Sequence, residues 1–295
     1  MFIKKEKIDK LAISGQTPFK EVWGSLKSNK KAMIGLGFIL FLIFLAVFAD
    51  LIAPYGMKEQ NLANALKGPS LRHWMGVDDL GRDVLSRIIY GTRTSISIGF
   101  LSVLIALVIG GTLGVIAGYF KGVTDAVIMR ICDVLLSIPS ILLAIAIVAS
   151  FGGGMTNLVI AIAIGNIPIF ARIIRSSVLG LTQRQFIEAS HALGSSHFRI
   201  IVKHIIPNTL SPIIVQVSMG IAGAILSAAG LGFIGLGLEA SVAEWGLMLS
   251  SGRGFMRTHM YLTIFPGLAI MLSILAFNML GDGIRDALDP KLRER

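Results

Sequence analysis

Residues 134–171 read VLLSIPSILLAIAIVASFGGGMTNLVIAIAIGNIPIFA and contain no charged side chain. A helix rises 1.5 Å per residue, so it needs about 20 apolar residues to cross the roughly 30 Å hydrocarbon core of a bilayer. The stretch is too long for one crossing, and Gly152, Gly153 and Gly154 divide it into two. It also lacks the residue-by-residue alternation of a barrel strand. We therefore predict two membrane-spanning helices here.

Four further stretches are long and apolar enough to cross a bilayer. Asp50 is the one charge in the first of them and lies near its end, and the last contains only a histidine. A charge at mid-bilayer costs about 2.5–3.5 kcal/mol, so such windows rarely arise by accident. The four stretches are residues 32–53, 94–118, 209–238 and 259–281. The fold class predicted is an all-α polytopic membrane protein with six transmembrane helices.

The composition supports this class and excludes others. Hydrophobic residues make up 54% of the chain and charged residues 15%, and the mean hydropathy is +0.77. Such a chain cannot cover itself with a water-compatible surface, which argues against a soluble enzyme. Cys132 is the single cysteine, so an internal disulfide is excluded.

The net charge of +10 is explained by its distribution along the chain. Residues 1–31, 119–130, 172–208 and 282–295 hold 19 of the 27 lysines and arginines. Basic residues collect on the cytoplasmic side of membrane proteins. We therefore predict that these four pieces and both termini are cytoplasmic, and we do not expect nucleic-acid binding.

The predicted spans offer no ionisable group for ion coupling. Their interior polar residues are neutral, namely Asn157, Asn166, Gln216 and Asn278. A carrier driven by an ion gradient usually places ionisable residues inside its spans. If the chain transports a solute, the energy is expected to come from another subunit. Asn157, Asn166 and Gln216 are candidates for lining a pathway, although each could instead bond a neighbouring helix.

Motifs of nucleotide, metal and catalytic sites are absent from the sequence. There is no G-x-x-x-x-G-K-[ST] phosphate loop, so we expect no ATP, other cofactor or metal to be bound by this chain. The histidines at 191, 197 and 204 lack the spacing of a zinc site on a helix. Asp78, Asp79 and Asp83 alternate with arginines and are interpreted as a solvated turn and a helix start.

Glycine and proline patterns predict a packed bundle. Gly110, Gly114 and Gly118 form two overlapping G-x-x-x-G steps that let helices approach closely. The match to G-x-G-x-x-G at residues 230–235 follows no strand and is interpreted as helix packing. Prolines that interrupt apolar segments are expected to kink or end helical turns; they are Pro139, Pro168, Pro212 and Pro266.

The most informative cytoplasmic segment is residues 172–208, RIIRSSVLGLTQRQFIEASHALGSSHFRIIVKHIIPN. Thr182 and Gln185 have the spacing of a capping box, which predicts a helix from Gln183. Gly194 is placed to end that helix in the left-handed conformation. Ser195 or Ser196 can cap a second helix, which we expect Pro207 to stop. Such a hairpin suits a groove on a soluble partner or a lipid surface, and the pattern does not choose between them.

The same segment resembles the EAA loop of permease subunits of ATP-binding-cassette (ABC) importers. The resemblance rests on Glu188, Ala189, Ser190 and Gly194, and then on Ile206-Pro207. Three positions depart from the family pattern: Ser190 replaces alanine, His204 replaces isoleucine and Ile206 replaces leucine. Four further stretches are similar to the C-type permeases of dipeptide and oligopeptide importers. They are MGVDDLGRDVLSRIIYGTRTSI at 75–96, AAGLGFIGLGL at 228–238, EWGLMLSSGR at 244–253 and FPGLAIMLSILAFNMLGDGIRDALDP at 265–290.

The resemblance implies a type I importer permease domain at 92–286, with its EAA coupling loop at 182–207. The first transmembrane helix at 32–53 would be an addition, flanked by a basic segment 1–31 and an extracytoplasmic segment 54–91. Residues 287–295 would be a cytoplasmic tail. The protein would lie in a bacterial inner or plasma membrane.

By the same resemblance, this chain and a B-type sister permease would form the pathway. Two cytosolic ATPases would hold ATP and Mg²⁺, and an extracytoplasmic binding protein would deliver the solute. Glu188 would accept a hydrogen bond from an ATPase, Ala189 would permit close packing and Gly194 would allow the bend. The cargo would be a dipeptide or oligopeptide, or else a nickel or other metal chelate or glutathione. A membrane scaffold or intramembrane enzyme is the alternative from another class.

Overall fold

The computed structural model describes residues 18–288, whose regular structure is helical apart from one isolated bridge between Val77 and Asp83. The helices are α2 (Pro18–Ser28), α3 (Lys30–Val47), α4 (Ala49–Ile52), η1 (Leu62–Asn64), α5 (Val84–Phe120), α6 (Gly122–Ser137), α7 (Ser140–Phe151), α8 (Met155–Leu181), α9 (Gln185–Ala192), α10 (His197–Ile200), η2 (Ile201–Ile205), α11 (Ile206–Phe233), α12 (Trp245–Gly252), η3 (Arg253–Phe255) and α13 (Tyr261–Leu288). The first 17 residues of the predicted segment 1–31, and residues 289–295 of the predicted tail, lie outside the described part.

Five helices are long and apolar enough to cross a membrane: α3, α5, α8, the continuous run His197–Phe233 and α13. The sixth predicted span is the pair α6 and α7, which is bent by 85°. The bend lies at Ile138 and Pro139, where Ile138 has an extended backbone. A residue before proline disfavours the helical conformation, which explains the break. The predicted all-α fold is confirmed, and the count of six spans includes this broken one.

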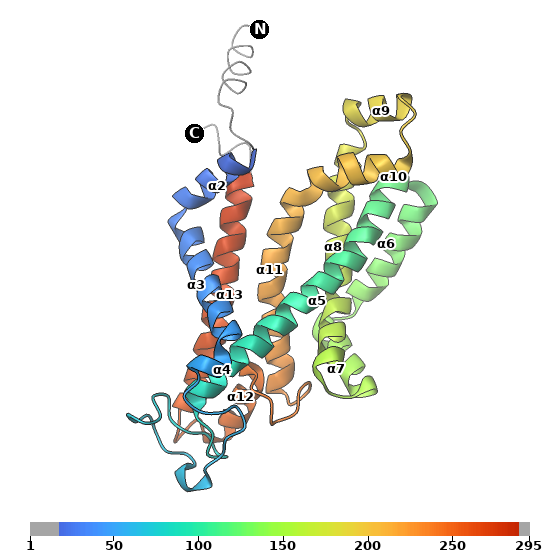
Figure 1. The fold of residues 1–295 in the computed structure, drawn as a ribbon. Helices are drawn as coiled ribbons and strands as arrows, with labels where there is room; N and C mark the ends of the chain where they lie inside the picture. Colours follow the sequence, from blue (N-terminus) through green and yellow to red (C-terminus); the bar gives the residue numbers. More distant parts are fainter. Residues whose placement is uncertain (1–17, 289–295) are drawn as a thin grey trace.

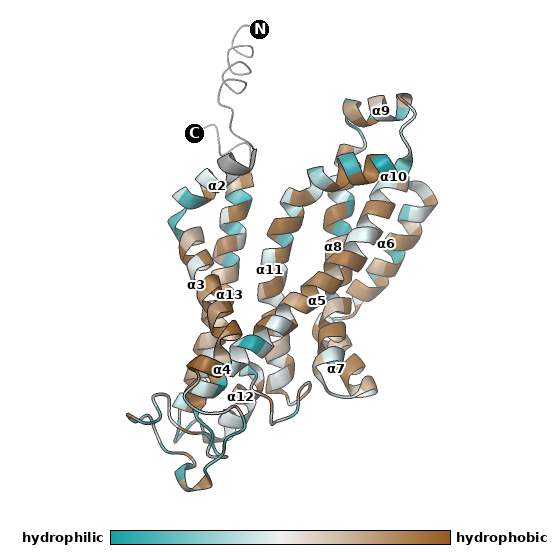
Figure 2. Ribbon diagram, in the orientation of Figure 1, coloured by the Kyte–Doolittle hydropathy of each residue, from teal (hydrophilic) through white to brown (hydrophobic). Residues whose placement is uncertain are grey.

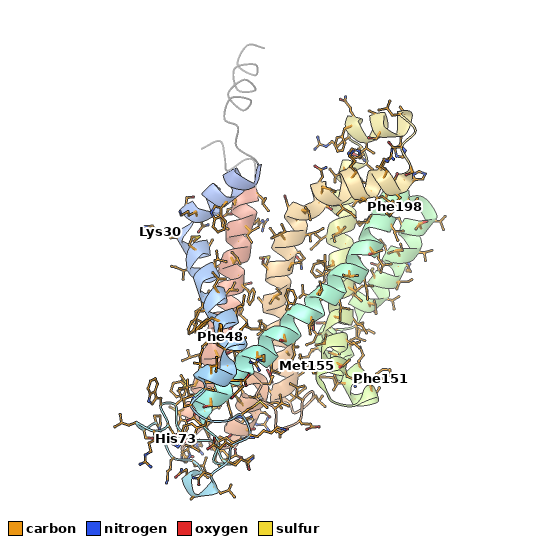
Figure 3. The ribbon with its side chains drawn as sticks, viewed as in Figure 1. Lys30, Phe48, His73, Phe151, Met155 and Phe198 are labelled. Atoms are coloured by element: carbon orange, nitrogen blue, oxygen red, sulfur yellow. The ribbon has the colours of Figure 1, made fainter. Side chains whose placement is uncertain are left out.

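The helices run between two ends of the molecule that carry different features (Figure 1). The hairpin end carries α2, α9, α10 and the last turns of α13, and the loop end carries residues 53–83 and α12. Apolar residues cover the middle of the helices, and hydrophilic residues gather towards both ends (Figure 2). Figure 3 shows Lys30 and Phe198 towards the hairpin end and His73 at the loop end. The predicted membrane slab therefore lies between these ends.

Helices α5 and α8 pack closely because three glycines on one face of α5 admit the backbone of α8. These are the predicted residues Gly110, Gly114 and Gly118. A Cβ atom added at Gly114 would lie 2.5 Å from the carbonyl oxygen of Ala171, closer than real contacts allow. The predicted role of these glycines in helix packing is confirmed.

Three of the four prolines lie inside helices that continue past them. Pro168 lies within α8, Pro212 within α11 and Pro266 within α13, whereas Pro139 alone of the four stands at a helix break. Membrane helices tolerate proline because neighbouring groups satisfy the carbonyl that it leaves free.

The charged turn that follows residue 77 is buried at the loop end, so the prediction of a solvated turn is wrong. Asp78, Arg82, Asp83 and Arg87 are all buried, and Asp79 is half-buried. The Nε of Arg82 donates to Asp78 at 2.6 Å. The predicted helix start is correct, because Asp83 accepts a hydrogen bond from the Ser86 amide and caps α5. Burial of Asp78, Arg82 and Asp83 is tolerated because Arg82 pairs with Asp78 and Asp83 contacts Nδ1 of His73 at 2.9 Å, whereas one guanidinium nitrogen of Arg87, Nη1, has no hydrogen-bond partner within residues 18–288.

The same arginines hold the chain that leads into α12. Arg82 donates to the carbonyl of Ala240 at 3.1 Å, and Arg87 donates to the carbonyl of Val242 at 3.2 Å. These contacts join residues more than 150 positions apart, which no local sequence pattern reports. They place the next residues, Glu244 and Trp245, against α5.

Glu244 is a buried carboxylate of the loop end that lies between the predicted spans 209–238 and 259–281. Its side chain is 2% exposed and accepts hydrogen bonds from the amides of Gly246 and Leu247, at 2.9 and 2.8 Å. Burial raises the pKa of Glu244, and these hydrogen bonds oppose that rise. A Cβ added at Gly232 of α11 would lie 2.6 Å from this carboxylate, so the predicted packing role of the 230–235 motif is confirmed at Gly232.

Candidate functional site

The segment between α8 and α11 forms a helical hairpin that stands at the hairpin end, with α9 at its tip (Figure 1). Its first helix begins at Gln185 rather than at the predicted Gln183. The capping box does not form, because α8 extends to Leu181 and the Thr182 hydroxyl donates back to the carbonyl of Leu179 at 3.0 Å. Arg184, in an extended conformation, starts α9 without a side-chain cap.

The turn between the two arms of the hairpin has the predicted geometry. Gly194 has φ of +75°, a left-handed conformation that side chains other than glycine rarely adopt, and nothing crowds its Cα. Ser196 then caps α10 by accepting from the amide of Arg199 at 3.4 Å. The prediction that a serine caps the second arm is confirmed, with Ser196 as that serine.

The second arm does not stop at Pro207, so that prediction is wrong. Helices α10, η2 and α11 run on as one helical span from His197 to Phe233. The residues just before Pro207 form a π-turn, in which the Ile206 amide donates to the carbonyl of Ile201. A regular α-helical turn would press the proline ring against a preceding carbonyl, and the wider turn relieves that contact. The second arm of the hairpin is therefore continuous with a membrane-spanning helix.

The tip of the hairpin exposes the predicted coupling residues. Glu188 lies exposed in the first turn of α9, next to exposed Ala189. The hydroxyl of Ser190 donates to the carbonyl of Phe186 at 2.9 Å, which occupies that hydroxyl within α9. Gly194 lies in the turn that follows, whereas Ile206 and Pro207 lie at the start of α11.

Apolar side chains surround this tip. Leu193 is 86% exposed and Phe198 is 76% exposed, while Ile187 on the opposite face of α9 is buried. A protruding helix with an exposed carboxylate, a small residue and large apolar side chains suits protein docking.

Tyr119 connects the hairpin to the bundle and was missed in the sequence analysis. Its hydroxyl lies 2.8 Å from Nδ1 of His197 and 3.3 Å from Nε2 of His191. The structure thus brings together two of the histidines that were considered for zinc, through a tyrosine at the end of α5. No group of three or more His, Cys, Asp or Glu side chains in residues 18–288 could hold a metal ion. No sequence pattern marks Tyr119 as a contact of the hairpin, because this contact depends on where α5 ends in space.

Two ion pairs fasten α6 to α8 near the base of the hairpin. Arg175 pairs with Asp125, and Arg172 pairs with Asp133 at 2.5 Å. Together with the Tyr119 contacts, they connect the hairpin with helices α5, α6 and α8.

The three neutral residues considered for a pathway lie in different surroundings. The amide of Asn157 donates to the carbonyls of Phe151 and Gly152, so it secures the three-glycine turn that Phe151 and Met155 flank in Figure 3. Asn166 donates to the carbonyl of Ile162 and lines a hollow of about 120 Å³. Gln216 lines a second hollow of about 450 Å³.

Two family models match the chain. The model described as "Binding-protein-dependent transport system inner membrane component" matches residues 110–294. The model described as "N-terminal TM domain of oligopeptide transport permease C" matches residues 17–69.

Related proteins cover almost the whole chain. A dipeptide transport system permease protein of Alkalihalophilus pseudofirmus is 51% identical over 94% of this chain and 91% of its own length. A glutathione transport system permease protein of Pectobacterium atrosepticum is 47% identical over 95% of this chain and 93% of its own.

Solved structures show the same fold at low identity. An inward-facing structure of the MetNI methionine ABC transporter has a TM-score of 0.57 at 17% identity, covering 69% of this chain and 97% of the other. An amino acid ABC transporter with histidines has a TM-score of 0.53 at 19% identity, covering 69% of this chain and 95% of the other. The chain therefore belongs to the inner-membrane components of binding-protein-dependent transport systems, and is a C-type permease subunit of an ABC importer.

Proposed function

We propose that this permease subunit imports dipeptides and oligopeptides. The proposal is supported by the 51% identity to a dipeptide permease and by the match to the N-terminal domain of an oligopeptide permease. Glutathione is the second candidate, favoured by the 47% identical glutathione permease. Glutathione is itself a small peptide, so one pathway chemistry suits both cargoes.

The subunit forms half of the pathway, and a B-type sister permease forms the other half. An extracytoplasmic binding protein delivers the cargo to the loop end, and two cytosolic ATPases bind ATP and Mg²⁺. This chain binds no cofactor of its own. The hairpin end and both termini face the cytosol, in agreement with the distribution of basic residues. The permease domain at 92–286 follows an added first helix at 32–53.

The observation that carries the coupling role is the protruding tip of the hairpin. Glu188 accepts a charge-assisted hydrogen bond from the ATPase, Ala189 allows its surface to approach, and Gly194 makes the turn. Leu193 and Phe198 fill an apolar groove on the ATPase. When ATP draws the two ATPases together, the hairpin rotates, and the continuous span from His197 to Phe233 carries the rotation into the membrane.

A Glu188→Gln substitution tests this role. A hydrogen bond to a charged group contributes about 1.5–3 kcal/mol, so its loss weakens ATPase binding about tenfold or more. We expect peptide uptake by whole cells and co-purification of the ATPase to fall together, with an unchanged amount of permease in the membrane. Asp282→Asn, at an exposed aspartate of α13 outside the hairpin and outside the loop end, is the matched control and leaves both readouts intact.

Normal ATPase recruitment and uptake in both Glu188→Gln and Gly194→Pro permease would remove the coupling role. A hairpin that bound anionic vesicles and never co-purified with an ATPase would instead favour the lipid-binding scaffold.

A further inference from the structure

One seam of the bundle, between α8 and α11, is left partly open. The two helices are antiparallel in Figure 1, and each presents a stripe of residues at helical spacing. The stripe of α11 contains Pro212, Gln216, Met219, Gly223 and Ser227. Steps of three and four residues keep them on one face. The stripe of α8 is formed by Ile162, Asn166, Ile169 and Ile173.

The two hollows already described lie in succession along this seam. The larger one, of about 450 Å³, joins Ile173 of α8 to Gln216 of α11 and reaches Arg285 near the end of α13. The smaller one, of about 120 Å³, joins Asn166 of α8 to Gly223 of α11, one to two turns nearer the loop end. Nothing lies within 4 Å of a Cβ built at Gly223. The two stripes and the two hollows between them outline a groove along the seam of α8 and α11.

The polar groups of this groove are neutral over most of its length. Asn166 and Gln216 supply amides, and Ser140 and Ser227 supply hydroxyls that form no hydrogen bond within residues 18–288. Isoleucines of α8 form the facing apolar wall. Arg285, at the hairpin end, is the one cation lining either hollow.

We propose that this groove is the chain's own share of the solute pathway and that its occupant is a peptide in transit. This inference rests on the peptide-import function proposed above. The amide groups of a peptide lose water inside a membrane and need neutral hydrogen-bond partners at successive depths. Weak, repeated contacts also let a solute leave, whereas a strong charged site would hold it. Arg285 meets the terminal carboxylate where the peptide approaches the hairpin end.

Two other occupants of the groove are less suited to its chemistry. Lipid chains would leave the Gln216 amide and the hydroxyls of Ser140 and Ser227 without partners in hydrocarbon, which is costly. A tightly packed helix of the sister subunit would have to fill a hollow of about 450 Å³ and also bring an acidic partner for Arg285. A peptide supplies both hydrogen-bonding groups and a carboxylate.

A Gly223→Leu substitution fills the groove and tests the proposal. We expect the uptake rate of a tripeptide to fall at least tenfold, with unchanged ATPase co-purification and permease abundance. Gly37→Leu is the matched control, because Gly37 lies on exposed α3 and also has nothing within 4 Å of a built Cβ. Wild-type uptake in both variants would overturn the proposal.

Cysteine labelling tests whether the groove contains water. With the buried Cys132 replaced by alanine, Gly223→Cys and Gly37→Cys are treated with a charged thiol reagent. We expect modification of Gly223→Cys, slowed by added tripeptide and binding protein, and no modification of Gly37→Cys. If only an apolar maleimide modifies Gly223→Cys, the groove faces lipid. If neither reagent reacts, a sister helix covers it, and both results contradict the proposal.

The two proposals fail in different ways. If wild-type complex takes up neither dipeptides nor oligopeptides, the peptide function is wrong, while charged-reagent access to Gly223→Cys still reports a water-filled groove. If uptake is normal but Gly223→Leu has no effect, only the assignment of the groove is wrong.

Discussion

Glu244, at the loop end, experiences two opposing effects on the pKa of its carboxyl group. Its carboxylate accepts hydrogen bonds from the amides of Gly246 and Leu247 and from the Ser95 hydroxyl, the last at 3.3 Å. These hydrogen bonds favour the charged form of Glu244, and by accepting the two from the amides Glu244 caps α12. Burial disfavours the charged form more strongly, so the pKa of Glu244 is raised above its usual 4.5. The cap therefore depends on a group whose ionisation is opposed by its surroundings.

This raised pKa predicts a defined pH dependence of stability. Above pH 4.5 the unfolded chain releases the proton that folded Glu244 still holds. The stabilisation that the raised pKa of Glu244 gives to the folded state is complete below pH 4.5, and it is lost as the pH rises through the pKa of Glu244 in the folded protein. Relative to wild type, Glu244→Gln should become more stable as the pH rises, by about 1.4 kcal/mol for each unit by which burial raises the pKa. Thermal unfolding in detergent at a series of pH values measures this.

Glutamine also loses one amide hydrogen bond of the cap, which lowers stability equally at every pH. The informative quantity is therefore the change with pH and not the offset. The exposed Glu239→Gln variant should follow wild type throughout. A constant difference between Glu244→Gln and wild type would show that Glu244 titrates normally.

At the scale of elements, helix packing was predictable wherever a local pattern expressed it. The G-x-x-x-G steps at 110–118 predicted a close helix contact, because small residues at that spacing have few other uses in a membrane, and the structure shows that the partner is α8. Gly194 identified the turn of the hairpin for a similar reason, since its backbone conformation excludes other residues.

Elements that depend on distant partners were not predictable. Pro207 suggested a helix end, but the π-turn before it lets the helix continue. The burial of Asp78 and Arg82 depends on carbonyls of residues 240–242, which no short pattern links to them. Tyr119 meets His191 and His197 only because α5 ends beneath the hairpin. The coupling residues were identified by resemblance to a family, and their roles stay predictions.

The α5–α8 contact predicts that replacing glycine by alanine has opposite effects on stability at two positions. Alanine at Gly114 places its Cβ 2.5 Å from the carbonyl oxygen of Ala171, so α5 and α8 must separate, at a cost of about 1–3 kcal/mol. Alanine at Gly180, near the end of α8, meets nothing within 4 Å and should stabilise that helix by up to about 1 kcal/mol. Thermal unfolding in detergent distinguishes them. Equal effects of both variants would mean that α5 and α8 are less tightly packed than described.

The whole molecule is polarised between its two ends. The hairpin end carries the described ends of the chain and the α9 tip, while the loop end carries the buried ion pairs and α12 (Figure 1). Basic residues are concentrated in the pieces whose described parts lie at the hairpin end. Because such residues resist translocation, this end should face the cytosol, where ATP is available. The coupling role and the direction of transport both require this orientation.

Labelling of single cysteines at the two ends tests the orientation. In the Cys132→Ala background, Leu71→Cys reports the loop end and Val123→Cys, in the first turn of α6, reports the hairpin end; both side chains are highly exposed, at 97% and 80%. A membrane-impermeant thiol reagent should modify only Leu71→Cys in spheroplasts and only Val123→Cys in inverted vesicles. Neither residue lies in the tip, so a bound ATPase does not confuse the result. The reverse pattern would place the hairpin outside the cell, away from any ATPase, and the coupling role of Glu188 would fall with it.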